Sequence, residues 1–250
     1  MLEIESNRHG FKTKTIWFSD EPFDVSGYAG VVFRDCTKDM NIDGFSKQVF
    51  TTLIIDLTQD LDDIWRGMSR SSCRSTIKRA EKEGIVILIN QEYEGFHKLN
   101  KEFRKAKGLP AYNLDIDYMK RYGTLVVSIH DGAILGGQFF IQDRKNMRWM
   151  LGASRRLEKT RNMQPLIGAA NRLKIWTAIQ YAKNNGIDKF DMGGYYTGKE
   201  ADPQMEGINN FKRSFGGNIV TNYIYEKDYS RIYAFGKRGY NKCKEIKKCL

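Results

Sequence analysis

The sequence predicts an α/β fold in which one mixed sheet is flanked by helices. Three observations support this prediction: a meander of three strands near the middle of the chain, a long helix followed by one more strand, and a composition suited to a packed core. Hydrophobic residues make up 41% and charged residues 28% of the 250 residues, which is typical of a globular protein. One α/β domain with an added N-terminal segment accommodates this length.

The first half of the chain alternates short β-like runs with helical patterns. Residues 1–50 form a predicted N-terminal β segment, because the runs Thr15–Phe18 and Gly30–Phe33 are separated by turn-forming residues. The predicted elements that follow are a strand at Phe50–Leu57, helices near Leu61–Met68 and Ser75–Glu83, a strand at Ile85–Ile89 and an amphipathic helix at Tyr93–Lys107. Gly84 ends the second helix, and Gly108-Leu109-Pro110 ends the third.

The second half begins with an antiparallel meander and ends with a crossover. The predicted meander strands are Leu125–His130, Ala133–Ile141 and Met147–Ala153. The Asp131-Gly132 pair between the first two strands is a hairpin signal. Asn162 and Pro165 open a long helix, Asn184-Asn185-Gly186 closes it, and a short strand at Asp188–Met192 follows. A right-handed crossover places this strand beside the last meander strand and parallel to it, and we expect the ends of the two strands to splay into a cleft.

The formal charge of +11 implies an anionic partner, such as RNA, a nucleotide-linked precursor or an acidic lipid surface. Residues 229–250 are predicted as a basic tail or helix, and the charge run Lys237–Lys248 is expected to be mainly solvated. Four scattered cysteines and three histidines show no zinc-binding spacing, so no metal or resident cofactor is expected. The first residues lack the pattern of an export signal and no apolar run reaches about 18 residues, which predicts a cytoplasmic protein. The oligomeric state stays open.

Two segments in the last third of the chain contain residues suited to a functional site. The segment Asp191-Met192-Gly193-Gly194-Tyr195 ends a strand, where paired glycines allow a ligand to approach the backbone. The same glycines also suit a tight turn without any ligand. The segment Gly207–Gly217 places an aromatic residue and two cations, Phe211, Lys212 and Arg213, between glycine turns. Phe211 and Phe215 at helical spacing would equally suit a core.

A third segment, Arg74–Gly84, is predicted as a basic helix, which by itself suits a solvated face. The order of the three segments, after the strand end at Asp56-Leu57, resembles the Fem-type peptidoglycan-bridge aminoacyltransferases. The resemblance spans Leu53–Tyr225, and its most specific part is the pattern G-I-x-x-F-K-x-x-F-G-G at Gly207–Gly217. Members of this family usually carry two such modules, whereas this chain has room for one.

The resemblance implies a GNAT-like fold over residues 51–228 that transfers an acyl group, often an aminoacyl group from tRNA, to an amine of a cell-wall or nucleotide-linked amino-sugar precursor. It implies catalytic roles for Lys212 and Asp191, with the Lys212 ammonium stabilising charge at the reacting carbonyl or contacting donor phosphates. The implied donor-binding residues are Phe211, Gly193, Gly194, Arg213 and Tyr195, and the implied acceptor- or anion-binding residues are Arg74, Lys78 and Arg79. Backbone amides near Gly193 and Gly194 would supply further hydrogen-bond donors. The base stays open between the substrate itself and a carboxylate, with Asp191, Glu200, Asp202 and Glu206 as candidates.

Two alternative functions stay open beside this one. In acetyl-CoA-dependent members of the wider superfamily, a glycine-rich loop opens the helix after the third meander strand, and its amides hold the pyrophosphate. The corresponding stretch Arg161–Gly168 lacks the glycine pair and Pro165 removes one amide, so aminoacyl-tRNA or another large anionic donor is expected. The alternatives are an acyl-CoA-dependent N-acetyltransferase of a small amine or amino sugar, and a non-catalytic RNA-binding module. Peripheral contact with the inner membrane surface is a further expectation.

Overall fold

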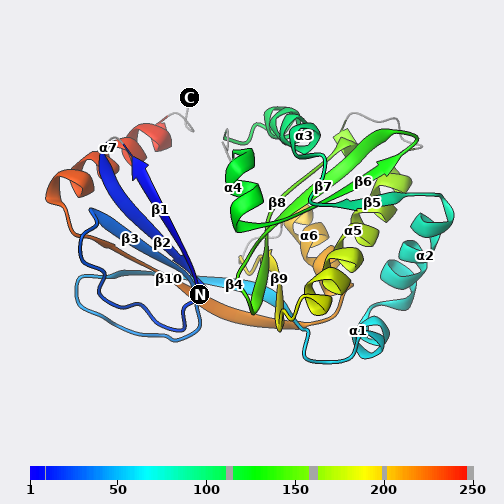
Figure 1. The fold of residues 1–250 in the computed structure, drawn as a ribbon, viewed down its shortest axis with the longest axis horizontal. Coiled ribbons are helices and arrows are strands. Elements are labelled where there is room, and N and C mark those ends of the chain that lie inside the picture. Colours follow the sequence, from blue (N-terminus) through cyan, green and yellow to red (C-terminus); the bar gives the residue numbers. More distant parts are fainter. Residues whose placement is uncertain (9, 111–114, 158–162, 199–201, 247–250) are drawn as a thin grey trace. The chain divides into compact units, whose positions relative to one another are not determined.

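Figure 1 shows the computed structural model of the chain, which describes residues 1–8, 10–110, 115–157, 163–198 and 202–246. The chain divides into two compact units, one formed by Met1–Thr51 with Thr221–Leu250 and the other by Thr52–Val220. It passes from one unit to the other within β4 (Ser46–Asp56) and again within β10 (Asn218–Asp228). Residues 221–228, which the sequence places with the main domain, therefore group with the N-terminal segment.

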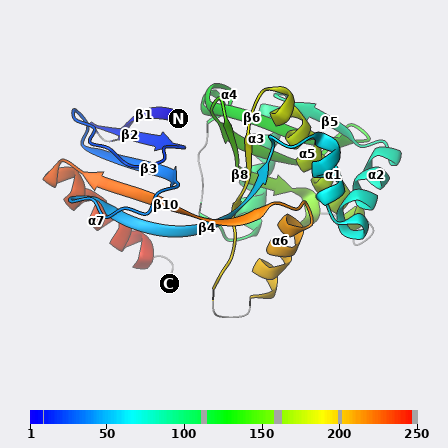
Figure 2. The ribbon, with the colours of Figure 1, turned by 90° about the horizontal axis from the view of Figure 1, so that it is seen from below.

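The smaller unit is built on a sheet with the strand order β1-β2-β3-β10. Its first three strands are β1 (Leu2–Arg8), β2 (Phe11–Trp17) and β3 (Gly30–Cys36). β2 is antiparallel to β1 and parallel to β3, and β10 is antiparallel to β3. The core of this unit consists of Ile16, Val31, Phe33, Cys36 and Tyr225. The C-terminal helix α7 (Arg231–Ile246) packs on this sheet (Figure 2). Its Tyr233 contacts Phe11 of β2 with ring centroids 5.5 Å apart.

The larger unit contains a mixed sheet with the strand order β4-β9-β8-β7-β6-β5. Its strands after β4 are β5 (Val86–Ile89), β6 (Gly123–His130), β7 (Ala133–Gln142), β8 (Asn146–Ser154) and β9 (Lys189–Gly194). The β6-β7-β8 meander is antiparallel, and Asp131 and Gly132 at its first turn have positive φ values of 49° and 70°, as a type I′ hairpin requires. β9 is parallel to β8. The predicted mixed α/β fold and the parallel pairing of these two strands are confirmed.

The pairing of β8 with β9 is short. It begins at Asn146↔Lys189 and ends at Arg148↔Asp191, although β8 continues to Ser154. The carboxyl-terminal half of β8 therefore has no pairing with β9. This is the place where a cleft between the two strand ends was expected.

Helices cover both faces of the larger sheet (Figure 1). They are α1 (Leu61–Gly67), α2 (Ser75–Lys82), α3 (Tyr93–Ala106), α4 (Ile116–Tyr122), α5 (Gln164–Asn184) and α6 (Pro203–Arg213), with a π-helical turn at Arg70–Arg74 and a 3-10 turn at Arg155–Leu157. α5 lies on one face and α3 on the other. Successive strand residues point to opposite faces, and a Cβ on Gly136 of β7 would meet Lys174 of α5, whereas a Cβ on Gly137 would meet Phe96 of α3. Apolar side chains of α5 and of the strands form the main core. Among the described helices, none has both the length and the apolar composition needed to cross a membrane.

Among the described strands and α-helices, β1, β10, α4 and α6 were not predicted. α4 follows Asp115, whose carboxylate accepts a hydrogen bond of 2.6 Å from the Tyr118 amide. α6 follows Asp202, which accepts hydrogen bonds from the amides of Gln204 and Met205. Each of these helices thus begins at an aspartate N-cap, a local signal that is present in the sequence.

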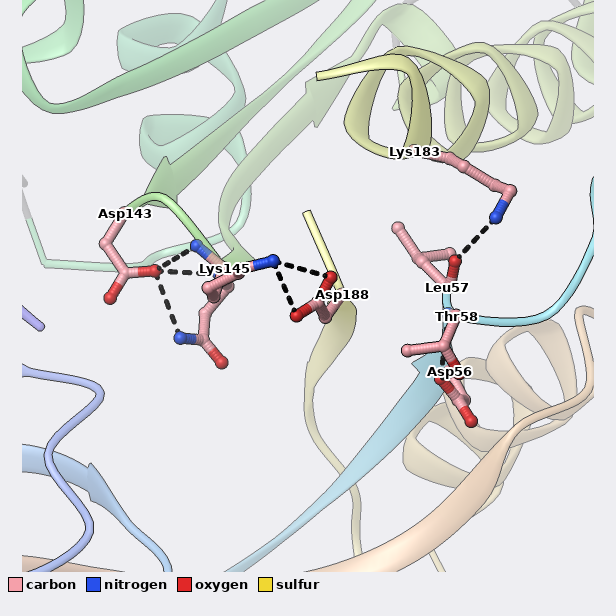
Figure 3. Close-up of polar contacts among 8 residues, drawn as sticks. Asp56, Leu57, Thr58, Asp143, Lys145, Lys183 and Asp188 are labelled. Carbon is pink, nitrogen blue, oxygen red and sulfur yellow. Dashed lines mark hydrogen bonds and ion pairs between the residues drawn. The ribbon is translucent and has the colours of Figure 1, made fainter. Parts of the chain in front are cut away.

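Polar contacts fix the end of the larger sheet at which β8 and β9 begin (Figure 3). The Lys145 ammonium lies 3.0 Å from the carboxylate of Asp188, which joins the turn before β8 to the residue before β9. The Asp143 carboxylate accepts a hydrogen bond of 2.8 Å from the Lys145 amide and so shapes that turn. Lys183 of α5 donates to the carbonyl oxygen of Leu57, just after β4, at 2.9 Å. These contacts hold the amino end of β9 between its two neighbouring strands. The functional site considered below lies at the carboxyl end of β9.

Candidate functional site

The carboxylate of Asp191 organises the chain at the far end of β9. Asp191 is 5% exposed, and it accepts hydrogen bonds from the Thr52 hydroxyl, from the Gly193 amide at 2.6 Å and from the guanidinium of Arg148. Gly193 has a φ of +75°, and a Cβ there would lie 2.9 Å from the carbonyl oxygen of Trp149. A side chain would therefore be both strained and obstructed at this position. The paired glycines form a tight turn whose first amide is bound to Asp191.

One face of α6 is attached to the segment that follows this turn. The side chain of Asn209 accepts a hydrogen bond from the Tyr196 amide at 3.0 Å and donates one to the Tyr196 carbonyl oxygen at 2.8 Å. One helical turn later, the Lys212 ammonium donates to the carbonyl oxygen of Gly194. Residues at i and i+3 lie on the same face of a helix, so both contacts come from one side of α6. The two segments predicted to share a site, Asp191–Tyr195 and Gly207–Gly217, are thus brought together.

Lys212 is a buried cation at the centre of this arrangement. Its side chain is 5% exposed, and its ammonium lies 5.7 Å from the centroid of the Trp149 ring. Burial lowers the pKa of Lys212 to about 8, while the negative charge of Asp191 acts in the opposite direction and the positive charge of Arg148 lowers it further. With this pKa, Lys212 is mainly charged at pH 7 and about half charged near pH 8.

Aromatic side chains separate Lys212 from a large cavity. Trp149 and Phe211 meet edge to face with ring centroids 6.3 Å apart, and both line the cavity. The Trp149 ring folds over Gly152, where a Cβ would lie 2.9 Å from the indole. The guanidinium of Arg172 lies 5.1 Å from the centroid of the Phe211 ring, within the range of a cation–π contact. Lys212 itself is not a lining residue, but it contacts the ring that forms the wall.

The cavity has a volume of about 1230 Å³ and a positively charged lining. Four cations line it: Arg79 of α2, Lys107 after α3, Arg156 after β8 and Arg172 of α5. Among the lining residues that the structure describes, none is aspartate or glutamate. Burial, together with the nearby charges of Arg156 and Arg79, lowers the pKa of Arg172. Such a clustering of like charges favours the binding of an anion.

The buried polar atoms near the cavity include an acceptor without a partner. Gln138 lines the cavity and is 3% exposed, and its side-chain oxygen has no hydrogen-bond partner. The side-chain Nε of Arg172 is also buried without a hydrogen-bond partner. Buried polar groups normally have partners in native proteins, so these two atoms are suited to contact a bound molecule. Among the described residues, no group of three or more His, Cys, Asp or Glu is placed to hold a metal ion.

The residues implied for the donor side are placed as follows. Phe211 lines the cavity, and Lys212, Asp191, Gly193 and Gly194 form the hydrogen-bonded turn beside it. Tyr195 is half-buried and packs against the main core. Arg213 is exposed, lies outside the cavity lining and donates a hydrogen bond of 2.7 Å to Asn210. Phe211, Gly193 and Gly194 thus lie at or beside the cavity wall, whereas the Tyr195 side chain packs against the core and Arg213 is exposed.

The implied anion-binding helix contributes one residue to the cavity. Arg79 lines it and donates a hydrogen bond of 3.0 Å to the carbonyl oxygen of Pro165 at the start of α5. Lys78 is exposed and lies outside the lining, as does the half-buried Arg74, whose Nε has no hydrogen-bond partner.

Among the described carboxylates considered as bases, Asp191 belongs to the turn beside the cavity, whereas Asp202 and Glu206 lie at the start of α6. Asp202 caps α6 through the amides of Gln204 and Met205, Glu206 is exposed on that helix, and Glu200 lies outside the described residues.

Sequence reasoning missed Arg172, Arg156, Lys107 and Gln138. Two local signals existed. Arg172 is a charged residue within the apolar sequence of α5, and Arg156 follows directly after the carboxyl end of β8, where ligands of α/β sheets commonly bind. No local pattern marks Lys107 or Gln138, because their role depends on which other elements meet them.

Comparisons with known proteins identify the fold. No protein-family model and no curated protein matches this sequence. Among solved structures, FemX is similar with a TM-score of 0.60 and 15% identity over 79% of this chain and 72% of that one. L-PGS from Bacillus licheniformis is similar with a TM-score of 0.54 and 15% identity over 83% and 70% of the two chains. The C-terminal domain of a protein assigned as a lysylphosphatidylglycerol synthetase from Agrobacterium fabrum has a TM-score of 0.55 and 12% identity over 80% and 68%.

At these identities the likeness shows the fold alone. The chain has the GNAT-like fold, a mixed sheet flanked by helices in which a parallel strand follows the meander and a long helix. The fold does not by itself define the reaction, which has to be argued from the site.

Proposed function

We propose that this chain is an acyltransferase that moves an acyl group, and more specifically an aminoacyl group, from a large anionic donor to an amine. The observation that supports this function best is the cavity of about 1230 Å³, lined by four cations and bordered by the Trp149–Phe211 wall with Lys212 behind it. A cation-rich cavity suits a phosphate-bearing donor, because guanidinium groups bind phosphate through two parallel hydrogen bonds.

The identity of the donor is proposed from the size of the cavity and the start of α5. The cavity is larger than the range of about 300 to 1,000 Å³ that is common for small-molecule sites. α5 begins with Gln164-Pro165, so one amide is missing from its first turn, and the Pro165 carbonyl oxygen accepts a hydrogen bond from Arg79. Both features support aminoacyl-tRNA over acyl-CoA.

The chemistry assigned to the site needs one positive charge and one aligned amine. The amine nitrogen attacks the ester carbonyl carbon of the donor, a C–N bond forms, and the ester C–O bond breaks. The Lys212 ammonium lies behind the Trp149–Phe211 wall, so in this scheme the Trp149 ring would move aside and the ammonium would then stabilise the negative charge on the carbonyl oxygen, a contribution of about 3 kcal/mol for one hydrogen-bond donor. The proton of the amine would pass to the departing ribose oxygen of the donor, which balances the reaction without a protein base.

Asp191 would act in this scheme as a positioning residue. Its oxygens already accept hydrogen bonds from Thr52, Gly193 and Arg148, so they hold the turn in place. Its charge also favours the protonated form of Lys212. Asp191 would therefore support the ammonium that the reaction needs.

The names of the structural neighbours are consistent with this proposal. A lysylphosphatidylglycerol synthetase is named for an aminoacylated product, and FemX shares the fold of this chain. Together with the Phe211-Lys212 motif, these names support a Fem-type module whose acceptor is an amine of a cell-wall or nucleotide-linked amino-sugar precursor. The choice of an amine acceptor, and so of a C–N bond in the product, is the most specific step of the proposal.

An acyl-CoA-dependent N-acetyltransferase is the second candidate. The observation that favours it is that the first turns of α5 line the cavity through Gln164, Pro165 and Gly168. In this case the same cations would bind the pyrophosphate of coenzyme A, and the acceptor would be a small amine or an amino sugar.

A transfer assay with parallel donors tests the proposal. Aminoacyl-tRNA carrying a labelled amino acid and labelled acetyl-CoA would each be supplied with nucleotide-linked amino sugars and small amines as acceptors. We expect label transfer from aminoacyl-tRNA, with loss of about 100-fold in the Lys212→Met variant and no loss in Arg213→Gln. Turnover of acetyl-CoA on a simple amine would replace the first candidate by the second. Salt-sensitive RNA binding with no transfer from either donor would identify a non-catalytic RNA-binding module instead.

A further inference from the structure

The C-terminal helix α7 of the smaller unit has one face fixed to its own sheet. Tyr233 packs against Phe11, and a Cβ on Gly30 would lie 2.8 Å from the Tyr233 ring. The ammonium of Lys237, one turn further on, lies 3.0 Å from the carboxylate of Asp228 and also bonds to Glu226. These contacts determine which side of the helix faces the sheet.

The opposite side of α7 presents apolar side chains to solvent. Ile232 is 74% exposed and Phe235 is 78% exposed, which makes them the two most exposed large hydrophobic residues in the described part of the chain. They are three residues apart, so they lie on the same face. Together they form a small exposed apolar patch on a helix that is otherwise rich in basic residues, which suits a contact with another surface.

The charge of this region indicates which partner the surface suits. From Arg231 to the end, the sequence contains seven basic residues and one acidic residue: Arg231, Lys237, Arg238, Lys242, Lys244, Lys247 and Lys248, against Glu245. A second copy of the chain would bring two such basic helices together, which their charge opposes. RNA would be attracted by the charge but has no need of exposed Ile232 and Phe235. An anionic lipid bilayer suits both properties, since it accepts apolar side chains and attracts cations.

We propose that α7 binds the surface of an anionic phospholipid bilayer. Ile232 and Phe235 enter the interface between headgroups and acyl chains, and the excess positive charge of the C-terminal sequence attracts the anionic headgroups. The helix lies on the membrane and does not cross it. This surface belongs to the smaller unit, and its role is separate from the transfer reaction proposed for the larger one.

Vesicle sedimentation with the full chain tests the proposal. The probes are vesicles of phosphatidylcholine alone and of phosphatidylcholine mixed with phosphatidylglycerol. We expect binding to the mixed vesicles only, weakening with salt, and a loss of about tenfold or more in the variant Ile232→Ser/Phe235→Ser. The matched control is Val86→Ser, which removes a 53% exposed valine from β5 of the larger unit and should leave binding unchanged.

Several outcomes would overturn the proposal. These are equal binding to both kinds of vesicle, no effect of the double variant, or a dimer in solution that the double variant converts to a monomer while vesicle binding is absent. Loss of RNA binding in the double variant, with no vesicle binding, would make this face an RNA contact. If the double variant has a lowered melting temperature, the single variants Ile232→Ser and Phe235→Ser take its place, and each should lower binding. Transfer to a soluble acceptor is measured on the same variants and should not change, so failure here is distinct from failure of the proposed function.

Discussion

Lys212 and Lys174 are two buried lysines of the larger unit in contrasting surroundings. Burial lowers the pKa of both, to about 8 for Lys212 and to about 7 for Lys174. The Lys212 ammonium donates to the Gly194 carbonyl oxygen and faces the Trp149 ring beside the cavity. The side-chain nitrogen of Lys174 is fully buried in α5 and has no hydrogen-bond partner.

The difference between the two lysines shows that a lowered pKa does not by itself mark a functional residue. Lys174 occupies space left free by Gly136, where a Cβ would lie 2.7 Å from its nitrogen, and it is not among the residues that line the cavity. Lys212 has a carbonyl partner, an aromatic neighbour and a nearby carboxylate that favours its charged form. We therefore expect Lys212 to affect the reaction and Lys174 to affect stability.

Removing the carboxylate near Lys212 should have the largest effect. Asp191→Asn removes the carboxylate from its ion pair with Arg148, whose side chain is only 13% exposed, so we expect the free energy of unfolding to fall by about 4 kcal/mol in urea denaturation. It should also lower the pKa of Lys212 further, toward that of Lys174, because the charge of Asp191 raises it. The control is Asp188→Asn at the other end of β9, which removes a more exposed carboxylate from its pair with Lys145 and should cost less than about 1 kcal/mol. Equal losses in the two variants would contradict the organising role of Asp191.

Replacing Lys212 should affect the rate and leave stability nearly unchanged. We expect Lys212→Met to lower turnover about 100-fold, or about 3 kcal/mol, with a similar melting temperature. Because the charged form is required and the pKa is about 8, wild-type activity should fall as the pH rises above 8. In Asp191→Asn this alkaline fall should shift to lower pH. An activity that rises through pH 8 would instead indicate that neutral Lys212 acts as a base. The control is Arg213→Gln, which replaces an exposed cation and should leave turnover unchanged.

Replacing Lys174 should stabilise the protein. Unfolded Lys174 has a pKa near 10.5, and burial lowers it to about 7, so between these values the unfolded chain binds more protons. Its contribution therefore makes the unfolding free energy rise with pH across this window, by up to about 1.4 kcal/mol per pH unit. Lys174→Met should remove that rise and add about 2 kcal/mol at pH 7, since an apolar side chain replaces a buried nitrogen without a partner. Urea denaturation between pH 6 and 9 measures the difference, and a variant less stable than the wild type would show that Lys174 has a stabilising role.

The sequence predicts the parts of the fold that depend on local patterns better than those that depend on distant pairing. The meander and the parallel β8–β9 pair follow from local patterns, namely alternating strands, the Asp131-Gly132 turn and the spacing of apolar residues in α5. β10 is harder to predict because it pairs with β3, 187 to 198 residues earlier (Tyr223↔Cys36 to Asp228↔Gly30), and such pairing leaves no local pattern. The meeting of Lys212 with the turn after β9 was predicted from the family motif and not from periodicity.

The cavity could not be predicted because its cations come from four separate elements. Arg79, Lys107, Arg156 and Arg172 are far apart in the sequence, and only the tertiary fold gathers them. Within α5, Arg172 and Lys174 are both basic residues in an apolar helix. They lie about 200° apart around the helix axis, at about 100° per residue, so one can line the cavity while the other is buried against the sheet. The sequence of α5 does not show which of the two faces a ligand.

Arg172 therefore offers the finest test of whether position at the cavity, and not burial, determines function. We expect Arg172→Gln to raise the KM for the donor about tenfold, or about 1.4 kcal/mol, with little change in kcat, because it removes a charge that binds donor phosphate without stabilising the reacting carbonyl. The KM of Arg172→Lys should lie between those of the wild type and Arg172→Gln. Lysine keeps the charge but lacks the planar group that contacts Phe211 and can bind phosphate through two hydrogen bonds. The control is Lys78→Gln, which removes an exposed cation outside the cavity lining and should leave KM unchanged. A lowered kcat at constant KM would place Arg172 near the reacting atoms, and equal KM values for all three variants would exclude this cavity as the donor site.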